Sequence, residues 1–272
     1  MNIQELETMA TDIRKDVITM TAEAGSGHPG GSLSATDILT VLYFHEMRVD
    51  SDNPQWEDRD RFALSKGHAA PALYAILARK GFFPKEELLK LRKIDSMLQG
   101  HPDMRGTPGV DMSTGSLGQG FSASCGMAIS AKIYKKDYRV YTLLGDGELQ
   151  EGIVWEAAMF AGHYKLDNLT AIIDYNGLQI DGPNEKVLTV SPVADKFRAF
   201  GWNVIEIDGH CMEDIIASID EAKRVKGAPT VIVAKTVKGK GVSFMENVVD
   251  WHGKAPKEDQ KLQALGELGG EM

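Results

Sequence analysis

A glycine-flanked acid follows one of the apolar segments of this chain. Gly145-Asp146-Gly147 comes directly after the segment 140–144, and Asn176 follows the next apolar segment, 170–174. The carboxyl ends of neighbouring parallel strands meet at one edge of a sheet, so we expect the Asp146 and Asn176 side chains to lie close together. The two glycines allow the backbone to approach a phosphate closely and leave its N–H groups unobstructed.

Carboxylate and amide oxygens are the ligands that a hard cation prefers in proteins. Asp146 alone would repel a diphosphate, whereas a cation held by Asp146 and Asn176 would attract one. Each of the two dipeptides, taken singly, is also typical of a tight turn. Their joint occurrence after two apolar strands favours a site in which Mg²⁺ bridges the protein to a diphosphate.

Histidine supplies a second signal, because four of the seven histidines lie beside glycine in breaks between the expected elements. A histidine in such a loop is poorly placed to pack in a core and well placed to present its ring nitrogens to a polar ligand. The histidines lack zinc-ligand spacing, and no cysteine lies nearby. His45 and His163 lack that setting, and His210 is expected in the turn that leads into the helix near Met212, so these three are assigned structural roles. The four candidates are His28, His68, His101 and His252.

The elements that must position these residues alternate between short apolar segments and helical patterns. This alternation predicts a doubly wound α/β fold, with a mostly parallel sheet and helices on both faces. The expected strands are 61–65, 140–144, 170–174, 203–207 and 230–234. The helical patterns between and after them are 69–79, 117–134, 153–164, 193–200 and 212–225.

Two helices precede the first strand. Apolar residues recur at a helical period from Ile3 to Met20, up to a glycine-rich break that begins at Gly25. Ser34, with Asp37 three residues later, offers an N-cap and a first-turn carboxylate for a second helix. The loops 95–115 and 176–191 exceed the normal connection length and are expected to be functional.

Composition limits the class of protein. The 272 residues, of which 43% are hydrophobic and 25% charged, suit one soluble domain over 1–272. No apolar run approaches the roughly 18 to 20 residues of a membrane span, and no signal peptide is present, so the cytoplasm is expected. The net charge of −9 argues against a nucleic-acid surface. Cys125 and Cys211 are interpreted as reduced structural thiols.

Taken together and in order, these motifs resemble transketolase. The resemblance extends over nearly the whole chain and is strongest to the N-terminal subunit of a split transketolase. A segment 238–241, Lys-Gly-Lys-Gly, leads to Trp251-His252-Gly253 and contributes to it. The other matching motifs are Ser26-Gly27-His28-Pro29-Gly30, Leu64-Ser65-Lys66-Gly67-His68-Ala69, Gly100-His101-Pro102, Thr114-Gly115-Ser116-Leu117-Gly118-Gln119-Gly120, and Gly145-Asp146-Gly147 with Asn176.

The resemblance implies thiamine diphosphate with Mg²⁺, for which Ca²⁺ or Mn²⁺ could substitute. The metal ligands would be Asp146, Asn176 and the backbone carbonyl of Leu178. His28, His68, His101 and His252 would act on the ketose hydroxyls and the developing oxyanion. The residues implied to contact the cofactor or its network are His68, Gly115, Leu117, Gly147, Glu151, Asn176 and His252.

The same resemblance implies a transferase that moves a two-carbon ketol unit from a ketose phosphate to an aldose phosphate. In that family an activating glutamate belongs to a pyrimidine-binding domain, which is absent here. We therefore expect that domain and the C-terminal domain on a partner subunit, in an α2β2 heterotetramer. The tail 257–272 is expected to form a terminal helix. Lys235, Lys238 and Lys240 could steer phosphorylated sugars, but exposed lysines are common, so a solvated loop is the favoured interpretation.

Other interpretations remain open from the sequence, two of them enzymes related in fold. The alpha chain of a 2-oxo-acid dehydrogenase also combines Gly-Asp-Gly with Asn in a separate thiamine-diphosphate subunit, but it does not explain His28-Pro29-Gly30 or Gly100-His101-Pro102. A deoxyxylulose-phosphate synthase would be a longer chain with different residues after the first histidine. A further interpretation, of another class, is a protein that binds thiamine diphosphate without catalysis.

Overall fold

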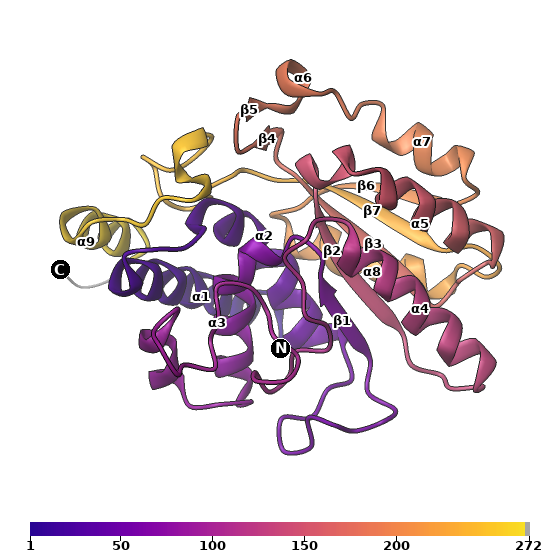
Figure 1. The fold of residues 1–272 in the computed structure, drawn as a ribbon, viewed down its shortest axis with the longest axis horizontal. Helices are drawn as coiled ribbons and strands as arrows, with labels where there is room; N and C mark the ends of the chain where they lie inside the picture. The colour runs from indigo at the N-terminus through magenta and orange to yellow at the C-terminus, as the bar shows by residue number, and fades with distance from the viewer. Residues whose placement is uncertain (270–272) are drawn as a thin grey trace.

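Five parallel strands form the central sheet of the computed structural model, which describes residues 1–269 (Figure 1). Their order in the sheet is β1-β2-β3-β7-β6, and each neighbouring pair is parallel. Because Gly145 of β2 pairs with Asp174 of β3, the residues that follow both strands emerge at one edge. The strands are β1 (Arg61–Leu64), β2 (Val140–Gly145), β3 (Leu169–Tyr175), β6 (Asn203–Asp208) and β7 (Thr230–Lys235).

Helices cover both faces of this sheet (Figure 1). One hydrophobic core lies under α1 (Ile3–Ala24), α2 (Pro29–Val41), α3 (Ala70–Lys80) and α8 (Met212–Arg224). The other lies under α4 (Gln119–Ile133), α5 (Gly152–His163) and α7 (Val193–Ala199).

Strand β2 shows how the sheet divides the two cores. Its side chains alternate, so that Tyr141 and Leu143 enter the first core while Val140 and Leu144 enter the second. All four are buried, as expected of a parallel strand between two helical layers. The predicted doubly wound α/β class is confirmed, and each strand of the sheet begins and ends within one residue of the expected bounds.

The start of the second helix was predicted wrongly. Helix α2 begins at Pro29, with His28 as its N-cap residue, and Ser34 lies inside the helix. Gly30 and Gly31 lie in the first turn of the helix, and packing requires glycine at the first of them, since a Cβ at Gly30 would lie 2.8 Å from the carbonyl oxygen of Trp251. Gly25, in the left-handed conformation, ends α1 as predicted.

Short elements occupy the connections. The loop 176–191 holds a small hairpin of β4 (Leu178–Gln179) and β5 (Gly182–Pro183) and the short helix α6 (Asn184–Val187), whereas 95–115 contains neither helix nor strand. The expected terminal helix is α9 (Glu258–Glu267); the last residues of that prediction, 270–272, lie outside the described part of the chain. The remaining elements are η1 (Leu42–Glu46), η2 (Gly67–Ala69), η3 (Lys85–Lys90), η4 (Gly147–Gln150) and η5 (Val249–His252).

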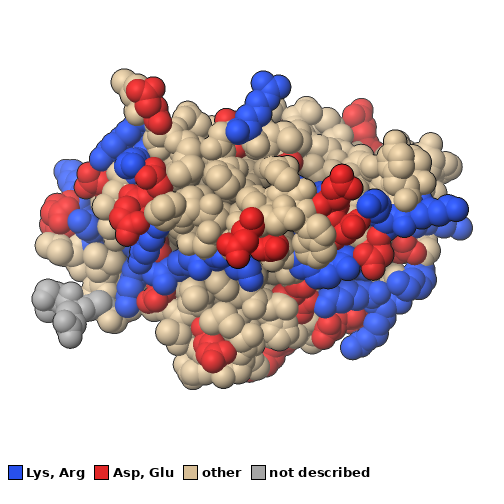
Figure 2. Space-filling model, turned by 90° about the horizontal axis from the view of Figure 1, so that it is seen from below, with Lys and Arg blue, Asp and Glu red and all other residues tan. Residues whose placement is uncertain are grey.

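Charged side chains of both signs lie on the surface (Figure 2). Figure 2 shows acidic and basic side chains interspersed over the face in view, without one extended basic area. None of the helices within residues 1–269 combines the length and the apolar character that a membrane span requires.

Candidate active site

A cavity of about 290 Å³ opens beyond the carboxyl ends of β2 and β3. Ligands bind at this edge in open parallel sheets, because the strand termini and the following loops converge there. Asp146, Asn176, His68 and His252 all line the cavity. Its other lining residues are Gly31, Lys66, Gly115, Leu117, Gly145, Gly147, Glu148, Gln150, Glu151, Leu178, Gln179, Ile180, Asp181 and Lys238.

Asp146 lies at the floor of the cavity and is 1% exposed. Its Oδ1 accepts a hydrogen bond of 2.8 Å from the Gly147 N–H, and its Oδ2 accepts one from the Gly177 N–H. Burial raises the pKa of Asp146 to about 6, and the charge of Asp174 acts in the same direction. A cation placed here would therefore stabilise the ionised carboxylate.

The other two predicted cation ligands come from the turn that follows β3. Asn176 Oδ1 accepts from the Leu178 N–H at 3.1 Å, and the Leu178 carbonyl oxygen accepts from Lys238 Nζ at 3.1 Å. The same ammonium lies 3.0 Å from His252 Nδ1. The Leu178 carbonyl, one of the three predicted ligand oxygens, thus already accepts a hydrogen bond from the Lys238 ammonium.

These residues fit a hard cation. Within the part of the chain that the structure describes, no cluster of three or more histidine, cysteine or acidic side chains could hold a metal. The protein offers instead one carboxylate, one amide oxygen and one carbonyl oxygen, all of them hard donors. Such a set leaves coordination positions for phosphate oxygens and water, as Mg²⁺ sites at phosphates commonly do.

Four histidines from separate segments meet above this floor. His28 precedes α2, His68 belongs to η2, His252 ends η5, and His101 lies in the loop 95–115. The His28 ring centroid lies 5.4 Å from that of His68, 5.5 Å from that of His252 and 6.5 Å from that of His101. The rings of His68 and His252 stack at 5.0 Å.

All four imidazoles favour the neutral form. Burial lowers the pKa of His28 to about 4 and that of His252 to about 3, and nearby positive charges add to both shifts. Burial likewise places the pKa of His68 well below its ordinary value and lowers that of His101. Near neutral pH each ring therefore has one N–H donor and one acceptor nitrogen, which suits contact with hydroxyls.

Glu148 fixes the glycine-rich loop that forms one wall. The carboxylate is buried, and its Oε1 accepts from the Gly118 N–H at 2.7 Å and from the Ser65 hydroxyl. Its Oε2 accepts from the Gly145 N–H at 3.0 Å. One side chain thus joins the ends of β1 and β2 to the segment that carries Gly115 and Leu117.

A buried ion pair lies beneath the cavity. Lys66 Nζ donates to Asp174 Oδ2, and neither side chain is appreciably exposed. Asp174 also accepts from the hydroxyls of Ser34, at 2.6 Å, and Thr236. Despite the burial, the positive charge of Lys66 and these hydrogen bonds hold the pKa of Asp174 below its ordinary value. The network joins α2 and β3 to the segments that follow β1 and β7.

Asp37, expected in the first turn of the second helix, is buried in α2 and has a different task. Arg14 Nη2 lies 2.6 Å from Asp37 Oδ2, and His210 Nδ1 lies 2.7 Å from the same oxygen. His210 Nε2 accepts from the Val237 N–H at 2.9 Å, so its proton is on Nδ1. The predicted structural role of His210 agrees with this arrangement.

The structure brings the sequence-predicted site residues together. His28 and His101 reach the site through the histidine cluster, and a Cβ at Gly115 would lie 3.0 Å from His101 Cγ. Glu151, the N-cap residue of α5, is exposed at the rim. The other predicted residues, His68, Gly115, Leu117, Asp146, Gly147, Asn176, Leu178 and His252, line the cavity.

The interpretation of Lys238 as a solvated residue is wrong. Its side chain is 2% exposed, because α2 and η5 cover it, and burial lowers its pKa to about 8. Lys66 and Glu148 were also missed. The only signal in the sequence for these two residues is their position: Lys66 lies two residues before His68, and Glu148 directly follows Gly147.

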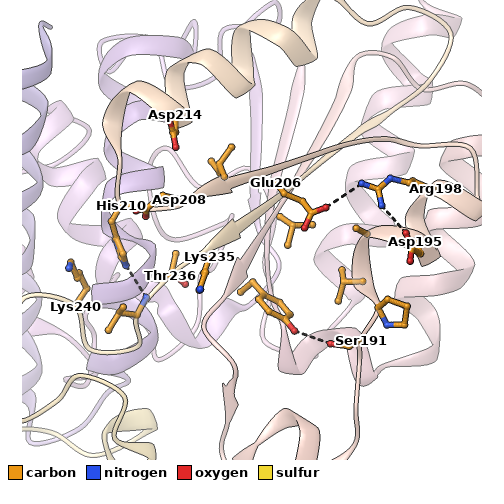
Figure 3. Close-up of a pocket in the computed structure, with 17 residues that line it drawn as sticks. Ser191, Asp195, Arg198, Glu206, Asp208, His210, Asp214, Lys235, Thr236 and Lys240 are labelled. Carbon is orange, nitrogen blue, oxygen red and sulfur yellow. Dashed lines mark hydrogen bonds and ion pairs between the residues drawn. The ribbon is translucent and has the colours of Figure 1, made fainter.

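A larger cavity, of about 1100 Å³, lies at the carboxyl ends of β6 and β7 (Figure 3). Arg198 is paired there with Asp195 and Glu206, and Tyr175 shares a hydrogen bond with Ser191 (Figure 3). Lys235 and Lys240 line this cavity and not the histidine site. Because the chemistry-bearing residues converge in the smaller cavity, we assign the active site to that one.

Known proteins are similar to this chain in sequence and fold over nearly its whole length. The family profile described as the thiamine diphosphate binding domain of transketolase matches residues 6–271. The structure of transketolase from Campylobacter jejuni superimposes with a TM-score of 0.94 at 37% identity, covering 100% of this chain and 44% of that one.

This chain is similar both to proteins of about its own length and to transketolases more than twice as long. The 6-deoxy-6-sulfo-D-fructose transketolase subunit SqwG of Clostridium sp. (strain MSTE9) is 48% identical, over 97% of this chain and 96% of that protein. An apulose-4-phosphate transketolase subunit of Phocaeicola vulgatus is 44% identical, over 98% of this chain and 95% of that protein. Human transketolase is 47% identical, but the match covers only 42% of its length.

Proposed function

Because this chain belongs to the transketolase family and matches its thiamine-diphosphate-binding domain, we propose that it works as the N-terminal subunit of a two-chain transketolase. In this role it transfers a two-carbon ketol unit from a ketose phosphate to an aldose phosphate. The observation that carries the proposal is the convergence of four neutral histidines on a cavity whose floor holds Asp146, Asn176 and the Leu178 carbonyl.

The floor of the cavity holds the cofactor in this proposal. Asp146, Asn176 and the Leu178 carbonyl ligate Mg²⁺, and the Gly147 N–H, His68 and His252 lie along the diphosphate. Gly115 and Leu117 line the path of the cofactor. Bound thiamine diphosphate supplies the carbon nucleophile that cleaves and forms the C–C bond.

The histidines act on the sugar. A neutral imidazole can donate to a developing oxyanion and accept a hydroxyl proton, and donors fixed before the reaction stabilise the transition state more than the ground state. His28 and His101 are assigned to the ketose hydroxyls, and His68 and His252 share that task. Their low pKa values keep them neutral donors and acceptors at the pH of metabolism.

A second chain completes the site. Two relatives that this chain covers almost entirely are named as subunits, whereas the match covers less than half of human transketolase. We propose that the partner brings the pyrimidine-binding domain with its activating glutamate, in an α2β2 assembly in which Glu151 lies at the interface. Residues 1–272 then form one domain of that enzyme, active in the cytoplasm, where its free cysteines stay reduced.

Ketol transfer from a ketose phosphate to an aldose phosphate tests the proposal. It is measured with Mg²⁺ and thiamine diphosphate, with this chain alone, with the C-terminal partner chain alone and with both. We expect activity only in the mixture. Full activity of this chain alone would contradict the two-chain enzyme. Cofactor binding without transfer in the mixture would favour the non-catalytic alternative.

A further inference from the structure

Arg92 lies at the mouth of the histidine site, and the proposed function gives it no role. Its side chain is exposed, and its guanidinium donates to Ser26 Oγ at 3.1 Å and to the Gly100 carbonyl oxygen at 3.4 Å. The Nη2 atom lies 3.5 Å from His28 Nδ1, at the outer limit of a hydrogen bond. Arg92 thus joins the segment before α2 to the loop that carries His101.

The backbone of Arg92 has an unusual conformation that is held by a hydrogen bond. Its φ of 61° is in the left-handed region, which non-glycine residues seldom adopt, and its N–H donates to the Leu98 carbonyl oxygen at 2.8 Å. A Cβ at Gly100 would lie 3.1 Å from Arg92 Cζ, so the glycine makes room for the guanidinium. An unusual backbone conformation next to a site is a reason to look for a function.

The charge of Arg92 is directed at the site and not at an acid. Throughout residues 1–269, Arg92 forms no ion pair with an aspartate or glutamate. Its neighbour Lys93, by contrast, pairs with Glu23 at 3.1 Å. Several elements pack against the His28 ring. The titratable and charged side chains that they bring to it are Arg92, His68, His101, Lys238 and His252.

A guanidinium can only donate hydrogen bonds. Where it faces His28 Nδ1, that nitrogen must be the acceptor, and a neutral ring then carries its proton on Nε2. The Nε2 edge of the ring faces the side of Gly253, where an added Cβ would lie 3.6 Å from Nε2. This is the edge turned away from Arg92.

We propose that Arg92 is a positioning residue, whose guanidinium fixes His28 in the tautomer with the proton on Nε2. This inference rests on the proposed function, in which His28 contacts a sugar oxygen, and it specifies that His28 donates from Nε2. The positive charge also opposes protonation of the ring, which agrees with the low pKa of His28.

The tautomer can be observed without any turnover. In ¹⁵N-labelled full-length chain, a long-range ¹H–¹⁵N spectrum distinguishes the two nitrogens of each histidine, and a His28→Gln sample assigns His28. We expect Nε2–H for His28 in the unsubstituted chain and a mixture of tautomers in Arg92→Gln. Nδ1–H in the unsubstituted chain, or an unchanged His28 spectrum in Arg92→Gln, would overturn the inference.

Kinetics with the partner subunit supply the second readout. Arg92→Gln is expected to lower kcat about tenfold, as outer partners of functional histidines do, and to move the acidic limb of the pH profile upward. Arg92→Lys keeps the charge, so the limb should stay while kcat falls. Lys93→Gln, at the neighbouring position, should resemble the parent enzyme.

The two proposals fail separately. If the spectra show the expected tautomers but no ketol transfer occurs with the partner, the proposed function is wrong and the tautomer assignment stands. If transfer occurs and the Arg92→Gln enzyme keeps the parent kcat and pH profile, the positioning role is wrong and the proposed function stands.

Discussion

The ammonium of Lys238 lies 3.1 Å from the carbonyl oxygen of Leu178, which is one of the three oxygens proposed for Mg²⁺. Lys238 is buried, and burial together with the charge of Lys66 lowers its pKa to about 8, which the charges of Asp146 and Asp174 only partly offset. The ammonium that now donates to a carbonyl oxygen on the cavity floor would also attract the negative charge of a bound diphosphate. We therefore expect Lys238 to contribute to the binding of the diphosphate.

Replacing Lys238 by methionine should weaken binding of thiamine diphosphate. Loss of one buried positive charge facing a diphosphate is expected to raise the dissociation constant by roughly tenfold or more, equivalent to about 1.4 kcal/mol. Titration calorimetry with saturating Mg²⁺ measures this. Lys235→Met is the matched control, because Lys235 is exposed in the same segment; equal loss in both variants would contradict the assignment.

Replacing Asp146 by asparagine should separate binding from stability. The variant loses the only carboxylate among the proposed cation ligands, so Mg²⁺-dependent binding of thiamine diphosphate should fall below detection. Burial raises the pKa of Asp146 to about 6, so removing the charge relieves a desolvation cost. Asparagine, however, keeps only one of the two oxygens that accept from the Gly147 and Gly177 N–H groups. Because these effects oppose each other, the cofactor-free variant should unfold within roughly 4 °C of the parent chain, measured by calorimetry.

His101→Ala is the comparison for that experiment. His101 belongs to the histidine cluster and not to the floor, so its loss should spare cofactor affinity and lower kcat with the partner subunit. Unchanged cofactor affinity in Asp146→Asn would show that the cation lies elsewhere.

The sequence predicted the sheet well because each strand is a short apolar run that ends in polar or glycine residues. The same logic placed Asp146 and Asn176 together, since both directly follow adjacent strands. It failed for Lys238 and Lys66, because lysines are usually exposed and burial depends on segments far apart in the chain. It failed for the start of α2, because Gly30 and Gly31 resemble a break when their packing partners, Trp251 and His68, are unknown.

Replacing Lys66 by methionine should destabilise the fold strongly. It leaves the carboxylate of Asp174 buried without its cation, which typically costs about 3 to 5 kcal/mol of unfolding free energy. Urea unfolding followed by circular dichroism gives the value. Lys136→Met removes a surface ion pair with Asp58 and should behave like the parent chain. A small effect of Lys66→Met would mean that hydroxyl groups alone satisfy Asp174.

The histidine cluster should make stability depend on pH in the acid range. The pKa of His28 is about 4 in the folded chain, below its ordinary value of 6.5. Between these values the unfolded chain binds more protons, so this contribution to stability is complete above pH 6.5 and is lost as the pH falls toward 4. His28→Gln should flatten the slope of unfolding free energy over that window. An equal slope in both chains would show that the ring is solvated.

Replacing Glu148 by alanine should damage the cofactor wall and the fold together. Its carboxylate accepts from the N–H groups of Gly118 and Gly145, and each buried donor left without a partner costs about 1 to 3 kcal/mol. We therefore expect a loss of at least roughly 2 kcal/mol in the free energy of unfolding, measured with urea.

Binding of thiamine diphosphate should also be weaker in Glu148→Ala, under conditions where the variant remains folded, because the loop that carries Gly115 and Leu117 loses the hydrogen bond that holds it. Glu7→Ala, at an exposed position of α1, should change neither measurement, and normal affinity in Glu148→Ala would show that the loop keeps its shape unaided.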